Sequence, residues 1–572
     1  MQSAKRTLRY ILTFLAHWLS TVVLCAAQSF PSVNTGQPVN SIRLVLPAKS
    51  DTAVESIGRI FARQLSQRCD ARTTTTGSAP LQVVLALEPG LGAESFRIAD
   101  DGKDNIRIIG NDARGLLYGV GKFLRNSRYD QGGFTPGDWR GTSMPQGSFR
   151  ALYAATHFMN FYEAAPVREV QAYVEDLGLW GANAVLLGLP AWDFKGFDDP
   201  AARRSLEHLR QILRAAKASG LQVGLTSCPN QGFADAPPAT RASSFPDGLG
   251  RRGSFGVNCC PSSPAGHQYL LNLQGRLFDE FKDIGLDYVL FWPYDEGGCG
   301  CAECWPWGSR GFPKLSREVV QAARARFPGI KSILSTWCYD TPPAGEWEGL
   351  ARFLESDQGW LNYIMADSHT DFPRYPPDQG VPGGLPLLNF PEISMYGRSP
   401  WGGFGANPLP ARLAGLWKQT QGRLAGGMPY SEGIYADMNE VICLQLYWQK
   451  SRAADDILKE YLAFEFSPEV VEDLSQAVRL LEATWLERGP DSARAFALLQ
   501  KAEARLTPRA KAAWRWRVLY LRGLIDSELF RRHDKMEGTV LKEAFDELTR
   551  IYHAENVHGM PVRPPQVSPA EH

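Results

Sequence analysis

The chain has 572 residues, too many for one ordinary hydrophobic core, so its length suggests several domains or one large barrel with attachments. Lysine plus arginine equals aspartate plus glutamate at 61 each, so no net field draws the protein to nucleic acid or to an anionic membrane. Aromatic residues make up 11% of the chain. The balanced charge and the aromatic content suit a neutral or sugar-like partner, such as an oligosaccharide or polysaccharide substrate.

Residues 1–27 have the pattern of a secretory signal peptide. A basic start precedes an apolar run over residues 11–24, and small residues at 25–27 provide a cleavage site. The apolar run is shorter than the ~20 residues that a membrane span needs. Lipid attachment at Cys25 is the alternative. We therefore expect a secreted or periplasmic protein with no integral membrane span once the leader is removed.

Residues 41–128 predict a small α+β domain in which helices cover one face of a sheet. In the second helix, Asn111 and Asp112 can form the N-cap, and the apolar residues after them recur at helical spacing. A Gly- and Pro-rich stretch up to Ser148 indicates a linker. The predicted strands lie at 42–46, 81–87, 95–98 and 106–109.

Residues 149–449 repeat a unit of apolar strand, loop and helix, which is typical of a parallel sheet. Eight such units over this length predict a (β/α)8 TIM barrel within an α/β protein. An open doubly wound sheet would carry a Gly-rich phosphate loop after an early strand, and the sequence has none. The predicted strands lie at 150–155, 184–189, 222–226, 288–292, 332–336, 363–366, 385–389 and 427–430.

The last part of the chain predicts helices followed by a tail. Residues 450–555 show apolar residues at spacings of three and four, which indicates a C-terminal helical domain. Residues 556–572 are rich in proline and lack an apolar pattern, so we expect a disordered tail.

Carboxylates follow three of the predicted barrel strands, at the end of the barrel where catalytic groups of this fold gather. Asp295 and Glu296 follow the fourth strand, Glu392 the seventh and Glu432 the eighth. Glycosidic cleavage needs one carboxylic acid to protonate the leaving oxygen and a second carboxylate as nucleophile or base. We expect Glu296 to be the general acid and Glu392 or Glu432 to be its partner. Asp295 could instead orient the acetamido group of an N-acetylated sugar, whose oxygen would attack the anomeric carbon.

Other polar and aromatic residues follow the same strands and predict a rim that binds sugar. Tryptophan rings can stack beneath sugar faces, while Asp, Asn and His side chains can bond the hydroxyls. Each residue alone could be structural, so the expectation rests on their common position at strand ends. The predicted rim comprises His157, Asn160, Trp192, Asp193, Tyr294, Trp337, Asp367 and His369.

The Asp295-Glu296 pair after a fourth strand, preceded by a domain ending in residues 110–119 (GNDARGLLYG), resembles the N-acetylhexosaminidases of glycoside hydrolase family 20. The front domain is also similar to that of family 67 alpha-glucuronidases. The resemblance covers residues 41–450 and implies an exo-acting glycosidase for an N-acetylhexosaminide or a uronide. It also implies that Arg150 holds sugar hydroxyls. Because Trp292-Pro293-Tyr294 stands where family 20 enzymes carry a histidine and two glycines, the sugar itself stays open.

Cysteines cluster behind the Asp-Glu pair, at positions 299, 301 and 304, and further cysteines follow other barrel strands. Disulfides are the commoner fate of close cysteines in an exported protein. Zinc is the second possibility, since Cys301 and Cys304 have Cys-x-x-Cys spacing, with Cys299 as a further candidate ligand. A catalytic thiol is the third. In the first two cases the cluster would rigidify the loop that holds Glu296.

Two other functions compete with glycoside hydrolysis. The chain could be a non-catalytic carbohydrate-binding protein that keeps the barrel without turnover. It could also be a metal-dependent hydrolase that uses the Cys, His and Asp residues at the strand ends. For the glycosidase itself we expect no cofactor and no nucleic-acid partner.

Overall fold

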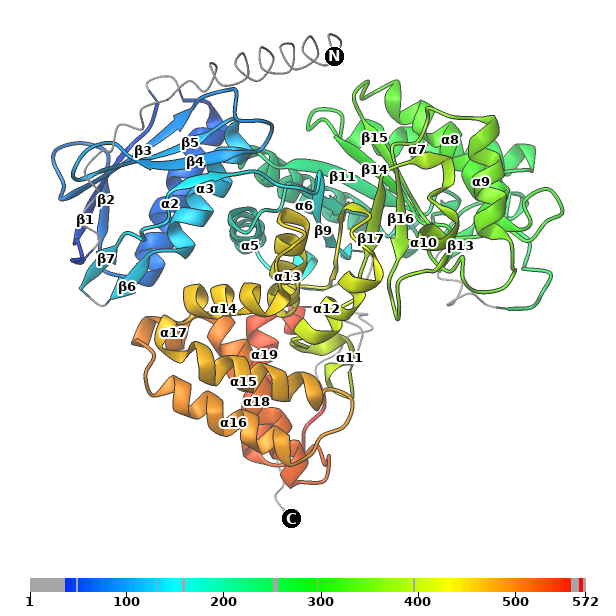
Figure 1. Ribbon diagram of the computed structural model, residues 1–572. Coiled ribbons are helices and arrows are strands. Elements are labelled where there is room, and N and C mark those ends of the chain that lie inside the picture. The colour runs from blue at the N-terminus through cyan, green and yellow to red at the C-terminus, as the bar shows by residue number, and fades with distance from the viewer. Residues whose placement is uncertain are drawn as a thin grey trace, which may run out of the picture.

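The computed structural model describes residues 36–47, 50–130, 132–156, 160–249, 256–295, 297–393, 397–556 and 565–568. The predicted signal peptide, His157 and Glu296 lie outside these residues. Figure 1 shows an N-terminal domain beside a barrel, with a helical domain packed below both. Within the described part of the chain, no helix combines the length and apolar character needed to cross a membrane.

The N-terminal domain is a six-stranded sheet in the order β2-β1-β3-β5-β4-β8. Neighbouring strands are parallel except at β4, which is antiparallel to β5 and β8. Alternate residues of β1 and β3 are buried, because one face of the sheet packs on the helices. The strands are β1 (Ser41–Val45), β2 (Arg72–Thr74), β3 (Leu81–Leu87), β4 (Phe96–Asp100), β5 (Asn105–Gly110) and β8 (Gly141–Ser143), and the hairpin β6 (Arg128–Asp130) with β7 (Gly133–Thr135) follows the helices.

Two helices, α2 (Thr52–Arg68) and α3 (Ala113–Arg125), cover this sheet. Asp112 forms the predicted N-cap of α3, since its side chain accepts a hydrogen bond from the Gly115 N–H at 2.9 Å. A Cβ at Gly115 would lie 2.1 Å from the Ser95 carbonyl oxygen. The first turn of α3 therefore rests directly on the backbone before β4, which only glycine allows.

The barrel is closed, parallel and eight-stranded, as the sequence predicts. Its first strand pairs with both the second and the last, which joins the two edges of the sheet. Nearly every strand residue is buried, as expected for a parallel sheet covered by helices. The strands are β9 (Phe149–Ala154), β10 (Ala184–Leu187), β11 (Gln222–Ser227), β14 (Tyr288–Phe291), β15 (Lys331–Ser335), β16 (Tyr363–Asp367), β17 (Leu387–Phe390) and β18 (Leu424–Gly427), which continues as β19 (Tyr430–Ser431).

The eighth strand starts three residues before the predicted position and has a break. Gly426 has a φ of +146°, and a Cβ there would lie 1.7 Å from the Phe149 carbonyl oxygen. Pro429 then lacks the N–H that a continuous ladder needs. The strand therefore closes the barrel as β18 and resumes as β19, which places Glu432 just beyond the barrel rim.

Helices between the strands form the outer layer of the barrel, and a short ribbon of β12 (Gln231–Gly232) and β13 (Val257–Asn258) follows β11. The helices are α4 (Phe161–Ala164), α5 (Val167–Leu179), α6 (Pro200–Ala218), α7 (Pro264–Glu280), α8 (Gly311–Arg324), α9 (Glu346–Ser356), α10 (Tyr375–Gln379), α11 (Trp401–Phe404), α12 (Pro410–Gln419) and α13 (Asp437–Trp448).

The C-terminal domain is helical, as predicted for residues 450–555. Its helices are α14 (Ala454–Glu465), α15 (Val471–Ala483), α16 (Pro490–Glu503), α17 (Pro508–Ala512), α18 (Trp514–Arg531) and α19 (Thr539–Ile551). The tail differs in part from its predicted disorder. Residues 565–568 are placed, and Ser568 pairs through its backbone with Met536 and Gly538, so backbone hydrogen bonding holds this short segment.

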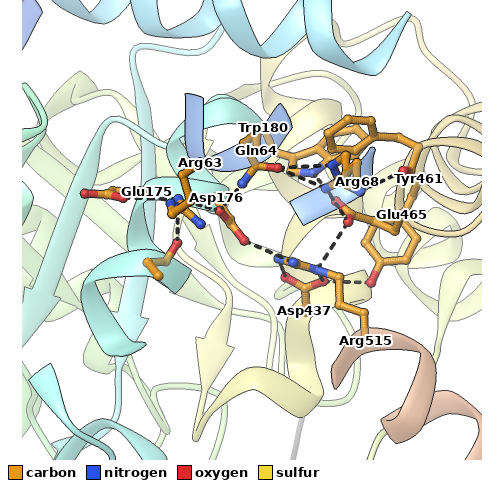
Figure 2. A network of polar contacts seen from close by, with 12 residues as sticks. Arg63, Gln64, Arg68, Glu175, Asp176, Trp180, Asp437, Tyr461, Glu465 and Arg515 are labelled. Carbon is orange, nitrogen blue, oxygen red and sulfur yellow. Dashed lines mark hydrogen bonds and ion pairs between the residues drawn. The ribbon is translucent and has the colours of Figure 1, made fainter. Parts of the chain in front are cut away.

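A network of buried ion pairs joins the three domains (Figure 2). Arg515 of α18 lies 2.8 Å from Asp437 of α13 and 3.0 Å from Asp176 of α5. Arg63 of α2 bonds the same Asp176 at 2.8 Å, and Glu465 of α14 lies 3.8 Å from Arg515. Glu465 also pairs with Arg68 of α2 at 2.8 Å, so each charge has an opposite partner from another domain, and the network fixes how the domains sit against one another.

Candidate active site

Five aromatic rings form a continuous layer at the carboxyl end of the barrel, which we call the aromatic floor. Rings in contact have centroids 4.8 to 6.1 Å apart, and all five side chains are buried. These apolar rings lower the local dielectric constant around the polar groups beside them. The floor consists of Tyr153, Trp292, Trp337, Phe390 and Tyr430, from β9, β14, β15, β17 and β19 or the residues just after them.

Glu432 lies beside this floor and is 3% exposed. One carboxylate oxygen accepts a hydrogen bond from the Tyr430 hydroxyl at 2.6 Å, and the other accepts one from the Tyr435 hydroxyl at 3.2 Å. Burial raises the pKa of Glu432 to about 7, although both hydroxyl donors oppose the shift. The carboxyl can therefore hold or release a proton near neutral pH, as a general acid must.

Glu392 follows β17 and is 2% exposed. Its carboxylate contacts Nδ1 of His369, whose backbone N–H donates to the Asp367 carboxylate at 2.7 Å. The imidazole of His369 packs 5.5 Å from the Trp337 ring of the aromatic floor. The structure thus brings three predicted site residues, Glu392, His369 and Asp367, together beside Trp337.

The end of β14 places Asp295 at the same mouth, three residues after Trp292 of the floor. Asp295 has a φ of +77°, an uncommon backbone conformation for a residue other than glycine, and such residues concentrate at functional sites. Tyr294 differs from its predicted role, because its hydroxyl donates to the buried carboxylate of Glu346. It anchors the loop to α9. The adjacent Glu296 lies outside the described residues, so its role as general acid stays a prediction.

The remaining residues of the predicted rim differ in their surroundings. Trp192 lines a cavity together with Trp292 and Tyr153, between the ends of β9, β10, β11 and β14, and Asp193 next to it is exposed. Asn160 is buried, and both of its polar atoms are used locally, in bonds to Ala155 and to the first turn of α4. Asn160 therefore shapes the loop after β9, whereas Trp192 lines the cavity.

Arg150 lies at the opposite end of the barrel from these residues. It is the second residue of β9 and is fully buried, and its guanidinium donates to Glu94 at 2.6 Å and to the Gly181 carbonyl oxygen at 2.7 Å. Catalytic groups of this fold gather at the carboxyl ends of the strands. The expected contact between Arg150 and sugar is therefore wrong, and the residue instead ties the N-terminal domain to the barrel.

The cysteine cluster contains four residues rather than the three that the local spacing indicated. Cys260, from the loop before α7, joins Cys299, Cys301 and Cys304 in the loop after β14, and the four sulfurs lie within 4.8 Å of one another. All nine cysteines in the described ranges are free thiols. The structure therefore contains no disulfide among the described cysteines.

No known family profile matches the sequence, and no curated protein matches it. Solved structures of glycoside hydrolases share the fold at low sequence identity. A family GH115 4-O-methyl-alpha-glucuronidase with specificity for decorated arabinogalactans is 11% identical, with a TM-score of 0.60 over 94% of this chain and 81% of that one. A family 89 glycoside hydrolase from Clostridium perfringens is 11% identical, with a TM-score of 0.58 over 87% of this chain and 64% of that one.

A GH20 beta-N-acetylhexosaminidase from Streptomyces coelicolor A3(2) is 14% identical, with a TM-score of 0.49 over 79% of this chain and 96% of that one. The predicted similarity to glycoside hydrolases is confirmed at the level of the fold. The chain spans about two thirds of the length of the family 89 enzyme.

Proposed function

We propose that the protein is an exported glycoside hydrolase that removes a terminal N-acetylhexosaminide or uronide from an oligosaccharide or polysaccharide. The observation that carries the proposal is the placement of Glu432 and Glu392. Both carboxyl groups are buried at the carboxyl end of the barrel, and burial raises the pKa of Glu432 to about 7. Glu432 accepts a hydrogen bond from Tyr430 of the aromatic floor, and Glu392 contacts His369, which packs against Trp337 of the floor. The leader-like pattern of residues 1–27 supports export.

In the proposed reaction, protonated Glu432 donates its proton to the leaving glycosidic oxygen. Glu392, held by His369, is the second carboxylate and acts as nucleophile or as the base that activates water. Asp295 lies on the neighbouring loop, where it can bond a substituent of the sugar. Glu296 is the alternative general acid, and in that case Glu432 would take the role of its partner.

A panel of 4-nitrophenyl glycosides, beginning with the N-acetylglucosaminide and the glucuronide, tests the proposed function. The wild-type protein is expected to release nitrophenol from at least one of them. A non-catalytic carbohydrate-binding protein would bind sugar in calorimetry and release nothing. A metal-dependent hydrolase would keep its full turnover of an oligosaccharide in Glu432→Gln, which the carboxylate mechanism excludes.

The pH dependence of kcat should report on Glu432. As an acid with a raised pKa it is protonated below about pH 7, so turnover should fall as the pH rises through that value. Tyr435→Phe removes a donor that stabilises the Glu432 carboxylate, so the pKa of Glu432 should rise. The fall of kcat at high pH, which is the alkaline limb of the pH profile, should then move up by about one pH unit.

The matched control for this shift is Tyr129→Phe. The Tyr129 hydroxyl donates to the Leu124 carbonyl oxygen in the N-terminal domain, so its loss should leave the limb in place. Rates of both variants are compared with those of the wild type from pH 5 to 9 on one oligosaccharide, whose leaving oxygen needs the proton. An identical alkaline limb in Tyr435→Phe and wild type would show that Glu432 is not the acid.

A further inference from the structure

Four cysteine sulfurs beside the barrel mouth have the arrangement of a tetrahedral metal site. The Sγ atoms of Cys260, Cys299, Cys301 and Cys304 all lie within 4.8 Å of one another, and those of Cys260 and Cys301 are 3.7 Å apart. In a zinc tetrathiolate, Zn–S bonds of about 2.3 Å place the sulfurs about 3.8 Å apart. The thiols are therefore gathered at nearly the separation that one Zn²⁺ ion requires.

The four ligands come from two loops that the chain separates widely. Cys260 belongs to the connection between β11 and α7, and the other three belong to the connection between β14 and α8. The second loop is folded by its own backbone, since the Cys304 N–H donates to the Cys301 carbonyl oxygen at 3.0 Å. At Gly300 an added Cβ would lie 2.0 Å from the Ser244 carbonyl oxygen, so this loop sits tightly on its neighbour.

Hydrogen-bond donors already surround the sulfurs. The backbone N–H groups of Cys301 and Ser243 point at Sγ of Cys299, and the backbone N–H of Ser262 points at Sγ of Cys260. The hydroxyl of Ser262 also lies 3.0 Å from Sγ of Cys304. Donors of this kind orient the ligands of a metal site and stabilise the negative charge on its thiolates.

We propose that Cys260, Cys299, Cys301 and Cys304 bind one Zn²⁺ ion as a closed tetrathiolate that joins the loop after β11 to the loop carrying Asp295. Each thiol gives up its proton to solvent on binding the metal. Four sulfur ligands fill the coordination shell of zinc and leave no position for water, so the ion is structural and does not take part in glycosidic cleavage.

The metal content of the purified full-length protein, expressed with added zinc, tests this site. We expect about one zinc ion per chain by elemental analysis and, after exchange with Co²⁺, the absorption of a tetrahedral cobalt tetrathiolate. Cys304→Ser should reduce bound zinc to below about 0.2 per chain after washing with a chelator. Cys69→Ser, which alters a buried cysteine of the N-terminal domain, should keep about one ion.

The wild-type measurements stand even if Cys304→Ser fails to fold. Intact-mass analysis of the same wild-type sample distinguishes zinc from disulfides, because two disulfides would remove four hydrogens and leave no thiol for the metal. Wild-type protein with well under one ion per chain, or cobalt protein without thiolate absorption, would overturn the proposal. Both readouts are independent of hydrolysis, so a failure of the proposed function would not affect them.

Discussion

Replacing Glu432 with glutamine is expected to lower kcat on an oligosaccharide substrate by about 10³-fold. The amide keeps the size of the side chain and can still bond the Tyr430 and Tyr435 hydroxyls, but it has no proton to give to the leaving oxygen. Sugar binding should change little, so KM or the calorimetric Kd should stay close to the wild-type value. Steady-state kinetics on an oligosaccharide that ends in the sugar identified by the panel measure both quantities.

Two comparisons make this result specific. Glu432→Gln should lower kcat far less on an activated aryl glycoside than on the oligosaccharide, because the aryl leaving group needs no proton. Glu440→Gln is the matched control, because Glu440 of α13 is also fully buried and burial raises its pKa well above the usual value. Its replacement should leave kcat unchanged. Equal losses on both substrates would assign Glu432 to the partner role and the acid to Glu296.

Arg515→Met is expected to lower the free energy of unfolding by about 3–5 kcal/mol. Arg515 neutralises Asp437 and Asp176 and lies near Glu465, and methionine would fill the space without the charge. Burial alone would raise the pKa of Asp176, but Arg63 and Arg515 hold this pKa below its usual value. Because such a lowered pKa stabilises the fold above the ordinary carboxyl pKa of about 4, the defect should stay full from neutral pH down to about pH 4 and shrink as the pH falls below it.

Arg509→Met provides the matched control for urea unfolding. Arg509 also joins the C-terminal domain to the N-terminal one, but its pair with Asp70 is exposed, at 45% and 62% for the two side chains. An exposed pair of this kind contributes only about 0–1 kcal/mol. Equal losses of stability in the two variants would contradict the role assigned to the buried network of Figure 2.

The barrel was predictable from the sequence because its signals are local. Seven of the predicted strands coincide with observed ones to within a few residues, since each is a short apolar run bounded by turn residues. The eighth strand was displaced because its start depends on a non-local contact. Gly426 passes against the Phe149 backbone, and an apolar pattern contains no signal of that approach.

The candidate site was predictable only in part, for the same reason. The rule that catalytic groups follow barrel strands located Glu392, Glu432 and Asp295 at one mouth. The partners of these residues come from tertiary packing, so the tyrosine donors of Glu432 and the place of Cys260 in the cysteine cluster required the structure. Arg150 was misjudged because its assignment came from a resemblance, whereas its position at the head of β9 points to the opposite end of the barrel.

Hydrolysis of an oligosaccharide in ¹⁸O-labelled water tests the central claim most directly. If Glu392 and Glu432 cleave a glycosidic bond, the sugar released by the wild-type protein should carry ¹⁸O at its anomeric hydroxyl, and the double variant with glutamine at both positions should release none. An oligosaccharide that binds the wild-type protein tightly and remains intact, or equal label from the double variant, would contradict the assignment.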